Sequence, residues 1–110
     1  MTLPMNSPKQ LNYDVIIVGG AMYGASVSWF LADNPDFDGS ILVVERDPTY
    51  TACSTVHTNS CIRQQFSREI NVRISQFGAA FVKNLRHYMG GDERVPNLPI
   101  QSYGYLYLSD

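Results

Sequence analysis

The stretch from Tyr13 to Ser26 decides the fold that this sequence predicts. It reads Tyr-Asp-Val-Ile-Ile-Val-Gly-Gly-Ala-Met-Tyr-Gly-Ala-Ser. A short run of apolar, mostly β-branched residues that stops at two glycines is typical of a buried parallel strand followed by a sharp turn. The small and apolar residues that come next predict a helix. That helix should end at Asp33-Asn34-Pro35, because the residue before a proline disfavours helix.

A second strand is predicted at residues 40–45, which read Ser-Ile-Leu-Val-Val-Glu. A strand, a helix and a strand of these lengths form a parallel βαβ unit. The glycine turn and Glu45 then lie at the same carboxyl edge of the sheet, where open α/β sheets bind ligands. The predicted fold class is therefore α/β, with residues 13–95 as the N-terminal part of a Rossmann-like dinucleotide-binding domain.

The glycine turn has the spacing of a phosphate-binding fingerprint. Glycine is usual at the first, third and sixth positions, which here hold Gly19, Ala21 and Gly24. The first glycine permits the turn, the third position lets the backbone approach a pyrophosphate, and the sixth lets the helix pack on the strand. The helix N-terminus then offers N–H groups to the phosphates. The residues predicted to bind the cofactor at this turn are Gly19, Gly20, Ala21, Met22, Tyr23 and Gly24.

Glu45 stands 21 residues after Gly24, and an acidic residue about 20 residues beyond the turn is expected to bind the ribose hydroxyls of a dinucleotide. Its negative charge would repel a 2′-phosphate, which disfavours NADP. Arg46 follows it, and its guanidinium either stacks beside the adenine or is solvated. The turn alone leaves FAD and NAD as alternatives.

Composition excludes several other classes. The 110 residues carry a formal net charge of −2 and are 45% hydrophobic, which is ordinary for a globular chain. No basic stripe indicates nucleic-acid binding, no apolar run is long enough for a membrane span, and no metal ligands are predicted. Cys53 and Cys61 do not form a Cys-x-x-Cys pair, so reduced thiols and a cytoplasmic location are expected, although both cysteines share one loop in which they could bridge.

The rest of the chain predicts a loop, a helix and one further strand. Residues 47–66 form a long polar connection, which is expected to be functional. Ser67 is predicted to cap a helix with an apolar stripe, closed by Gly90-Gly91. Residues 103–108 alternate tyrosine with leucine, as in a half-exposed antiparallel strand. The predicted division is a leader at 1–12, the cofactor domain at 13–95, and the start of a substrate-domain sheet at 96–110.

Three strand-like runs are fewer than the five or six of a complete nucleotide-binding sheet. We therefore expect this chain to be the first part of a longer protein.

Several of these runs together resemble a known family. The runs are Val-Gly-Gly-Ala-Met-Tyr-Gly-Ala-Ser, Val-Val-Glu-Arg, Ser-Thr-Val-His at residues 54–57 and Ile-Arg-Gln-Gln-Phe-Ser at residues 62–67. They are similar to the N-terminal part of the glycine/D-amino-acid oxidase family, and within it to sarcosine and dimethylglycine dehydrogenase-like flavoproteins. Alanine at the third position of the turn also occurs in that family.

The resemblance implies FAD as the cofactor and oxidation of a secondary or tertiary amine, or an amino acid, by hydride transfer to the flavin. It implies an electron acceptor that is either oxygen or an electron-transfer protein. Ser54, Thr55 and His57 are expected along the cofactor, and Arg63 near the flavin ring as the catalytic candidate, where a cation stabilises reduced flavin. An ion pair with a distant carboxylate is the alternative for Arg63.

His57 takes the place of a histidine that is joined covalently to flavin in dimethylglycine dehydrogenase-like members. Here Val56 replaces the tryptophan before it, and Thr-Asn-Ser replaces Ala-Ala-Gly after it. A histidine near the flavin without a covalent bond is therefore the favoured interpretation. Two alternative functions stay open: an NAD-linked dehydrogenase domain, and a non-catalytic flavoprotein that serves as an assembly factor.

Overall fold

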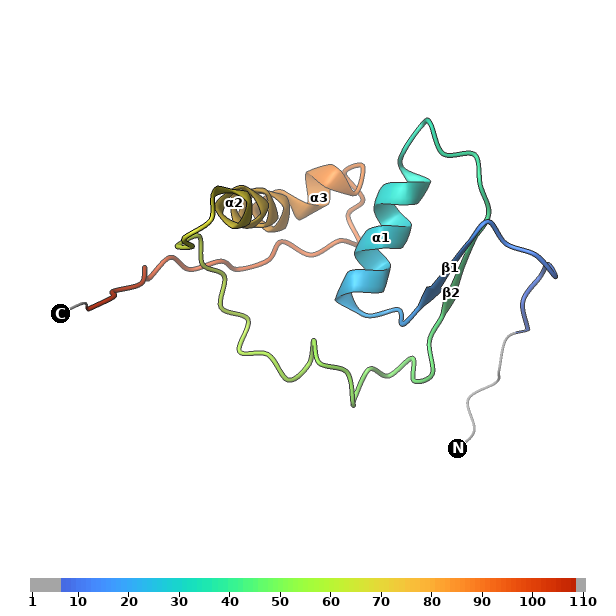
Figure 1. Cartoon of the computed structure of the whole chain (residues 1–110), viewed down its shortest axis with the longest axis horizontal. Coiled ribbons are helices and arrows are strands. Elements are labelled where there is room, and N and C mark those ends of the chain that lie inside the picture. Colours follow the sequence, from blue (N-terminus) through green and yellow to red (C-terminus); the bar gives the residue numbers. More distant parts are fainter. Residues whose placement is uncertain (1–6, 109–110) are drawn as a thin grey trace. The chain divides into compact units, whose positions relative to one another are not determined.

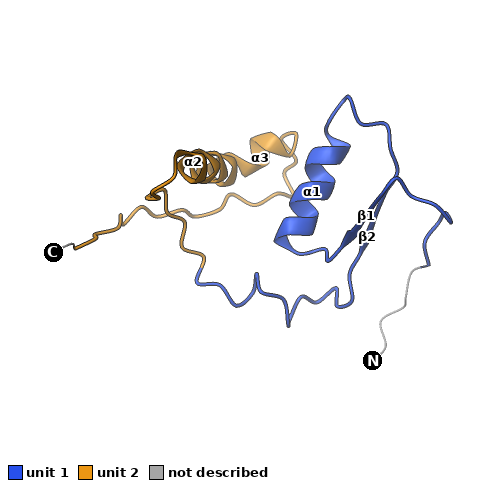
Figure 2. Cartoon of the chain, in the orientation of Figure 1, with its two compact units in different colours: residues 1–59 blue, residues 60–110 orange. Residues whose placement is uncertain are grey.

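A computed structural model describes residues 7–108 of the chain (Figure 1). The elements, in order, are β1 (Val15–Val18), α1 (Met22–Ala32), β2 (Ile41–Val44), α2 (Glu69–Lys83) and α3 (Leu85–Tyr88). The chain divides into two compact units, residues 1–59 and residues 60–110 (Figure 2). The first unit holds β1, α1 and β2, and the second holds α2 and α3.

The two strands of the first unit pair in parallel, as predicted. The register runs from Val15 opposite Ile41 to Val18 opposite Val44. The amino ends of the strands are joined by side chains as well. Asp14 Oδ2 accepts hydrogen bonds from Ser40 N and Ser40 Oγ, both at 2.7 Å. These bonds to Ser40 hold the pKa of the Asp14 carboxyl below its ordinary value, so the charged form of Asp14 stabilises the pairing.

Helix α1 lies against one face of this sheet (Figure 1). Its alanines and Trp29 line an apolar hollow of about 410 Å³ with Ile41 and Val43 of β2. The helix ends at Ala32, where Asp33-Asn34-Pro35 predicted its end. Asp33 N still donates to Trp29 O, and Asn34 Oδ1 then accepts from Asp36 N. The turn after α1 is thus held by an asparagine side chain, as is common in such turns.

The opposite face of β1 is exposed. Ile16 is 59% and Val18 is 86% exposed, and on α1 the apolar side chains of Tyr23 and Val27 also face solvent. Among residues 7–108, Ala79 is the one buried apolar side chain, and 9% of its surface is still exposed. The apolar core of the described residues is therefore thin.

In the second unit, α2 begins at Glu69, and its N-cap is Arg68 without a side-chain hydrogen bond. The prediction that Ser67 caps this helix was wrong. Arg68 is still extended (φ −108°, ψ 130°), so Ser67 is a residue too early for its hydroxyl to act as the N-cap. An ion pair between Glu69 and Arg73, at 2.6 Å, links the first turn to the next instead.

The predicted apolar stripe of α2 continues into α3. Phe81 lies 6.1 Å from Phe77 and 4.9 Å from Tyr88 between ring centroids. Asn84 interrupts the helix, because its side chain donates to Ala80 O at 2.8 Å while its backbone leaves helical geometry. Gly90 and Gly91 have positive φ angles of 69° and 78°, so the glycine pair ends α3 where it was expected to.

Residues 103–108 form no strand in the structure, in contrast to the prediction from their alternating pattern. A strand exists only when a second strand pairs with it, and none does within residues 7–108.

The loop at 47–66 has only turns, as predicted. Of the predicted leader and the predicted final segment, residues 1–6 and 109–110 lie outside the described residues, and the domain boundaries stay predictions. No helix between residues 7 and 108 is long and apolar enough to cross a membrane.

Candidate functional site

At the glycine turn between β1 and α1, the backbone of the turn lies close to the backbones of β2 and of α1. Gly19 has a φ of +100°, which an L side chain rarely adopts, and its N–H donates to Val44 O at 2.7 Å. Gly24 is buried in α1. A Cβ on Gly24 would lie 1.8 Å from Gly19 O and 3.2 Å from Ile17 Cγ2. The helix therefore packs on the turn only because Gly24 has no side chain.

Glu45 is held across the same turn. Its Oε2 accepts a hydrogen bond from Gly20 N at 2.7 Å, and its Oε1 accepts one from Asp47 N at 2.9 Å. The N–H of Asp47, and then that of Gly20, holds the pKa of the half-buried Glu45 carboxyl below its ordinary value. The carboxylate is charged at neutral pH, and each oxygen keeps a further lone pair for a ligand hydroxyl.

Gly20 is enclosed by the chain that leaves β2. A Cβ on Gly20 would lie 3.2 Å from Tyr50 Oη, 3.4 Å from Glu45 Cβ and 3.5 Å from Val43 Cγ1. The Tyr50 hydroxyl donates to Gly20 O at 3.3 Å. Tyr50 was not among the predicted site residues, and its sequence position alone gave no sign that it would reach the turn.

The N-terminus of α1 opens toward the site without a capping side chain. Ala21 is the N-cap residue, is extended (φ −71°, ψ −161°), and makes no side-chain cap hydrogen bond; the first turn holds no acidic residue. The first N–H groups of a helix have no acceptor within the helix, and the helix dipole makes this end positive. Ala21, Met22 and Tyr23 thus provide the backbone that a phosphate group would approach.

The loop after β2 is ordered by Asp47. Asp47 Oδ1 accepts from Thr49 N at 3.0 Å and from Thr49 Oγ1 at 2.5 Å, and Oδ2 accepts from Thr51 Oγ1 at 3.0 Å. The Thr49 side chain, followed by the Thr49 N–H, keeps the pKa of Asp47 below its ordinary value. An aspartate that binds its own chain two residues on is a known turn former, so the Asp-Pro-Thr-Tyr-Thr sequence was the signal for this loop.

Arg46, Ser54, Thr55 and His57 lie in the first unit with the turn. Arg46 is exposed, and so are Ser54 and His57, while Thr55 is half-buried. His57 N donates to Ser54 O at 3.2 Å, which closes a turn of the loop. The structure thus places these residues on the chain that continues from Glu45, and their contacts with a cofactor stay predictions.

Arg63 belongs to the second unit. Its guanidinium stacks over the ring of Phe66 at 5.1 Å, and its Nη1 donates to Tyr107 Oη at 3.3 Å. Desolvation, followed by the interaction with Cys61, raises the pKa of the neighbouring Tyr105 hydroxyl. Arg63 therefore contacts two aromatic residues of this unit, and its predicted position near a flavin ring stays a prediction.

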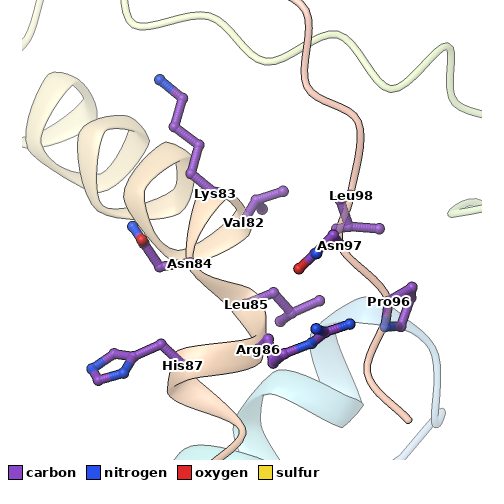
Figure 3. Close-up of a pocket in the computed structure, with 9 residues that line it drawn as sticks. All are labelled: Val82, Lys83, Asn84, Leu85, Arg86, His87, Pro96, Asn97 and Leu98. Atoms are coloured by element: carbon purple, nitrogen blue, oxygen red, sulfur yellow. The ribbon is translucent and has the colours of Figure 1, made fainter. Parts of the chain in front are cut away.

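A separate hollow of about 280 Å³ lies between the α2–α3 junction and the segment after it (Figure 3). Figure 3 shows the Arg86 side chain pointing toward Pro96, whereas Lys83 and His87 extend away from it. Arg86 Nε donates to Val95 O at 2.9 Å. The one cation that points inward thus holds the backbone of the same unit.

Between residues 7 and 108, no three histidine, cysteine or acidic side chains cluster as metal ligands would, and no disulfide joins Cys53 to Cys61.

The chain is similar to proteins named FAD-dependent oxidoreductase domain-containing protein 1. It is 40% identical to the Xenopus laevis protein over 100 residues and 43% identical to the Bos taurus protein over 99 residues, which is 87% of this chain in each case. It is 34% identical over 91% of its length to the Drosophila melanogaster homologue. No protein-family profile and no solved structure matches the chain. The chain spans about a fifth of the length of the curated relatives that it matches.

Proposed function

We propose that the chain is the N-terminal, FAD-binding part of an FAD-dependent oxidoreductase. The observation that carries this proposal is the glycine turn with Glu45 held across it, in a chain whose relatives are named as FAD-dependent oxidoreductases. The turn supports a dinucleotide in general, and the names of the relatives favour FAD over NAD.

The residues of the turn fit the diphosphate and adenosine half of FAD. The pyrophosphate would lie against the backbone from Gly20 to Tyr23, which ends in the uncapped N-terminus of α1. Glu45 would accept hydrogen bonds from the ribose hydroxyls with the lone pairs that Gly20 and Asp47 leave. Because Gly24 lacks the space for a methyl group, the close packing of α1 on this turn requires glycine at that position.

The proposed reaction is oxidation of a secondary or tertiary amine, or of an amino acid. It rests on the resemblance to the glycine/D-amino-acid oxidase family, which implies that Ser54, Thr55 and His57 would lie along the cofactor and Arg63 beside the flavin. When bound, FAD would supply an acceptor for the hydride on the carbon next to the substrate nitrogen. Oxygen or an electron-transfer protein would accept the electrons, and the expected cytoplasmic location rests on the cysteines alone.

The proposal that this is part of a longer enzyme has physical support in the exposed apolar surface. In larger α/β sheets helices cover both faces, whereas Ile16 and Val18 of β1 are exposed here. A helix that is apolar all round, as α1 is, is typical of one packed on several sides. We therefore propose that the substrate pocket lies on further chain, and that residues 1–110 alone do not catalyse.

Binding of nucleotides to the 110-residue chain tests the site. Fluorescence anisotropy of FAD gives its dissociation constant, and ADP should compete with FAD because it carries the diphosphate and ribose that the turn would hold. FMN lacks the adenosine half and should not compete. Glu45→Ala should weaken FAD binding, while Glu93→Ala, an exposed acid in the second unit, should leave it unchanged. Equal competition by FMN and ADP would contradict the proposed site.

The visible spectrum of the longer protein distinguishes the oxidoreductase classes. An FAD enzyme carries flavin absorption that an amine substrate bleaches under anaerobic conditions. A protein without flavin absorption that binds NAD would instead be an NAD-linked dehydrogenase. Flavin absorption that no amine or amino acid bleaches would contradict the proposed substrate class and favour a non-catalytic flavoprotein.

A further inference from the structure

The two polar backbone atoms of Gly20 are both held from the chain that follows β2. Gly20 N donates to the Glu45 carboxylate at 2.7 Å, and Gly20 O accepts from the Tyr50 hydroxyl at 3.3 Å. Gly20 lies in the phosphate-binding turn, directly before Ala21, the N-cap residue of α1. Fixing both of its polar atoms fixes the direction of the turn.

Tyr50 reaches Gly20 in a backbone conformation that costs free energy. Its φ is +59°, which is unusual for a residue with a large side chain. The loop compensates for this strain, since Tyr50 N donates to Asp47 O at 3.0 Å. The Asp47 side chain also holds Thr49 and Thr51 on either side of it. A strained residue persists only where its surroundings determine its conformation.

We propose that Tyr50 is a positioning residue of the cofactor site, whose hydroxyl on Gly20 O holds the phosphate-binding turn in its ligand-binding geometry before a ligand arrives. The identity of the ligand in this inference rests on the proposed function. The inference that Tyr50 fixes the geometry of the turn rests on the contacts of Gly20 alone. A turn that is already in place loses less conformational entropy on binding, which increases affinity.

The same contact would crowd a side chain at residue 20. A methyl group there would meet Tyr50 Oη at 3.2 Å, which is tighter than ordinary van der Waals contact, whereas the next two neighbours are at ordinary distances. The hydroxyl oxygen is thus the atom that would have to shift by a few tenths of an ångström to admit a side chain at residue 20. Removing that oxygen should therefore reduce the cost of Gly20→Ala, and this coupling is specific to the proposed contact.

The test compares Tyr50→Phe with Tyr13→Phe. Tyr13 is a matched control, because its hydroxyl also bonds to a backbone atom, Gln10 N, at 3.2 Å, near the end of β1 away from the turn. Tyr50→Phe should raise the dissociation constant for FAD about two- to fivefold, the loss of one neutral hydrogen bond. Tyr13→Phe should leave that constant unchanged. The urea midpoints of the two variants should agree, because the proposed role is positioning rather than overall stability.

Amide hydrogen exchange of the ligand-free chain, measured by NMR, tests without FAD whether the Tyr50 hydroxyl fixes the turn. Gly20 N–H should be protected in the wild type and about two- to fivefold less protected in Tyr50→Phe. Gly20→Ala should also weaken FAD binding less in the Tyr50→Phe background than in the wild type. A smaller loss of FAD affinity in the Tyr50→Phe background supports the contact, and an equal loss of affinity in both backgrounds overturns it.

The outcomes separate the two proposals. If the wild type binds FAD and Tyr50→Phe binds it equally well, the role of Tyr50 is overturned and the FAD site stands. If the wild type does not bind FAD or ADP, the proposed function of this chain fails, and the exchange of Gly20 N–H then decides the role of Tyr50. Unprotected Gly20 N–H in the wild type, or equal protection in Tyr50→Phe, overturns that role.

Discussion

Gly24→Ala should destabilise the first unit strongly, although alanine is the better helix former. The added Cβ would lie 1.8 Å from Gly19 O and 2.9 Å from Gly19 C. Contacts under 3.0 Å do not occur for real Cβ atoms, so α1 would have to move about 1 Å from the turn, and both contact atoms belong to backbone that cannot rotate away. Overpacking a close-packed site costs about 1–3 kcal/mol, and we expect the upper end here.

The matched control is Gly78→Ala in α2. Gly78 is also a helical glycine, but a Cβ there would meet no atom within 4 Å. Only helix propensity acts at this site, so the substitution should stabilise α2 by about 1 kcal/mol. The two substitutions make the same chemical change in two helices. The gain in helix propensity is common to both, so a difference of about 3 kcal/mol between them would measure the close approach at the turn.

Hydrogen exchange followed by mass spectrometry is the suitable assay, because it reports the opening of each helix separately. Peptides from α1 should lose protection in Gly24→Ala, by about tenfold for each 1.4 kcal/mol. Peptides from α2 should gain protection in Gly78→Ala. Unchanged or greater protection of α1 in Gly24→Ala would refute the close packing of helix on turn, and with it the reason given for glycine at the sixth position of the motif.

Three further predictions concern the site. Gly19→Ala should destabilise β1 and the turn by about 1–3 kcal/mol through strain at its positive φ, measured by urea unfolding; an unchanged midpoint would contradict it. The lowered pKa of Glu45 means that its contribution to stability is fully present above its unfolded-state pKa and is lost as the pH falls through the folded-state value. The protection of Gly20 N–H, relative to its intrinsic exchange rate, should accordingly fall in acid in the wild type and lose this dependence on pH in Glu45→Gln. The same fall in both proteins would show that another group causes it. Acid precipitation of the flavin-loaded longer protein should leave all the yellow colour in the supernatant, whereas colour in the pellet that His57→Ala abolishes would establish a covalent bond.

The βαβ unit could be predicted because its signals are local. The β-branched runs, the glycine turn and Asn34-Pro35 each act over a few residues, and each determined its element to within about one residue at the ends. Residues 103–108 could not be predicted in this way. Their alternation of tyrosine and leucine describes which face a strand would bury, but pairing needs a partner strand, and none is present within the described residues.

The site was predictable in its outline and not in its contacts. The spacing from Gly24 to Glu45 placed the carboxylate at the edge of the sheet that holds the turn, since parallel neighbours end together. The sequence contains no signal that Glu45 would bind Gly20 N–H, or that Tyr50 would adopt a positive φ and bond Gly20 O. Both depend on how the loop after β2 folds back, and that path is fixed by the set of bonds to Asp47.

These contacts bear on the choice of ligand. Glu45 already binds two N–H groups, so a second anionic group close to it would be repelled without a further donor to offset the charge. A ribose hydroxyl, by contrast, donates a hydrogen bond to the lone pairs that remain. The geometry therefore favours an unphosphorylated ribose, as in FAD or NAD, over the 2′-phosphate of NADP. NADP should accordingly compete with FAD more weakly than NAD does, and Glu45→Gln should narrow that difference because it removes the repelling charge.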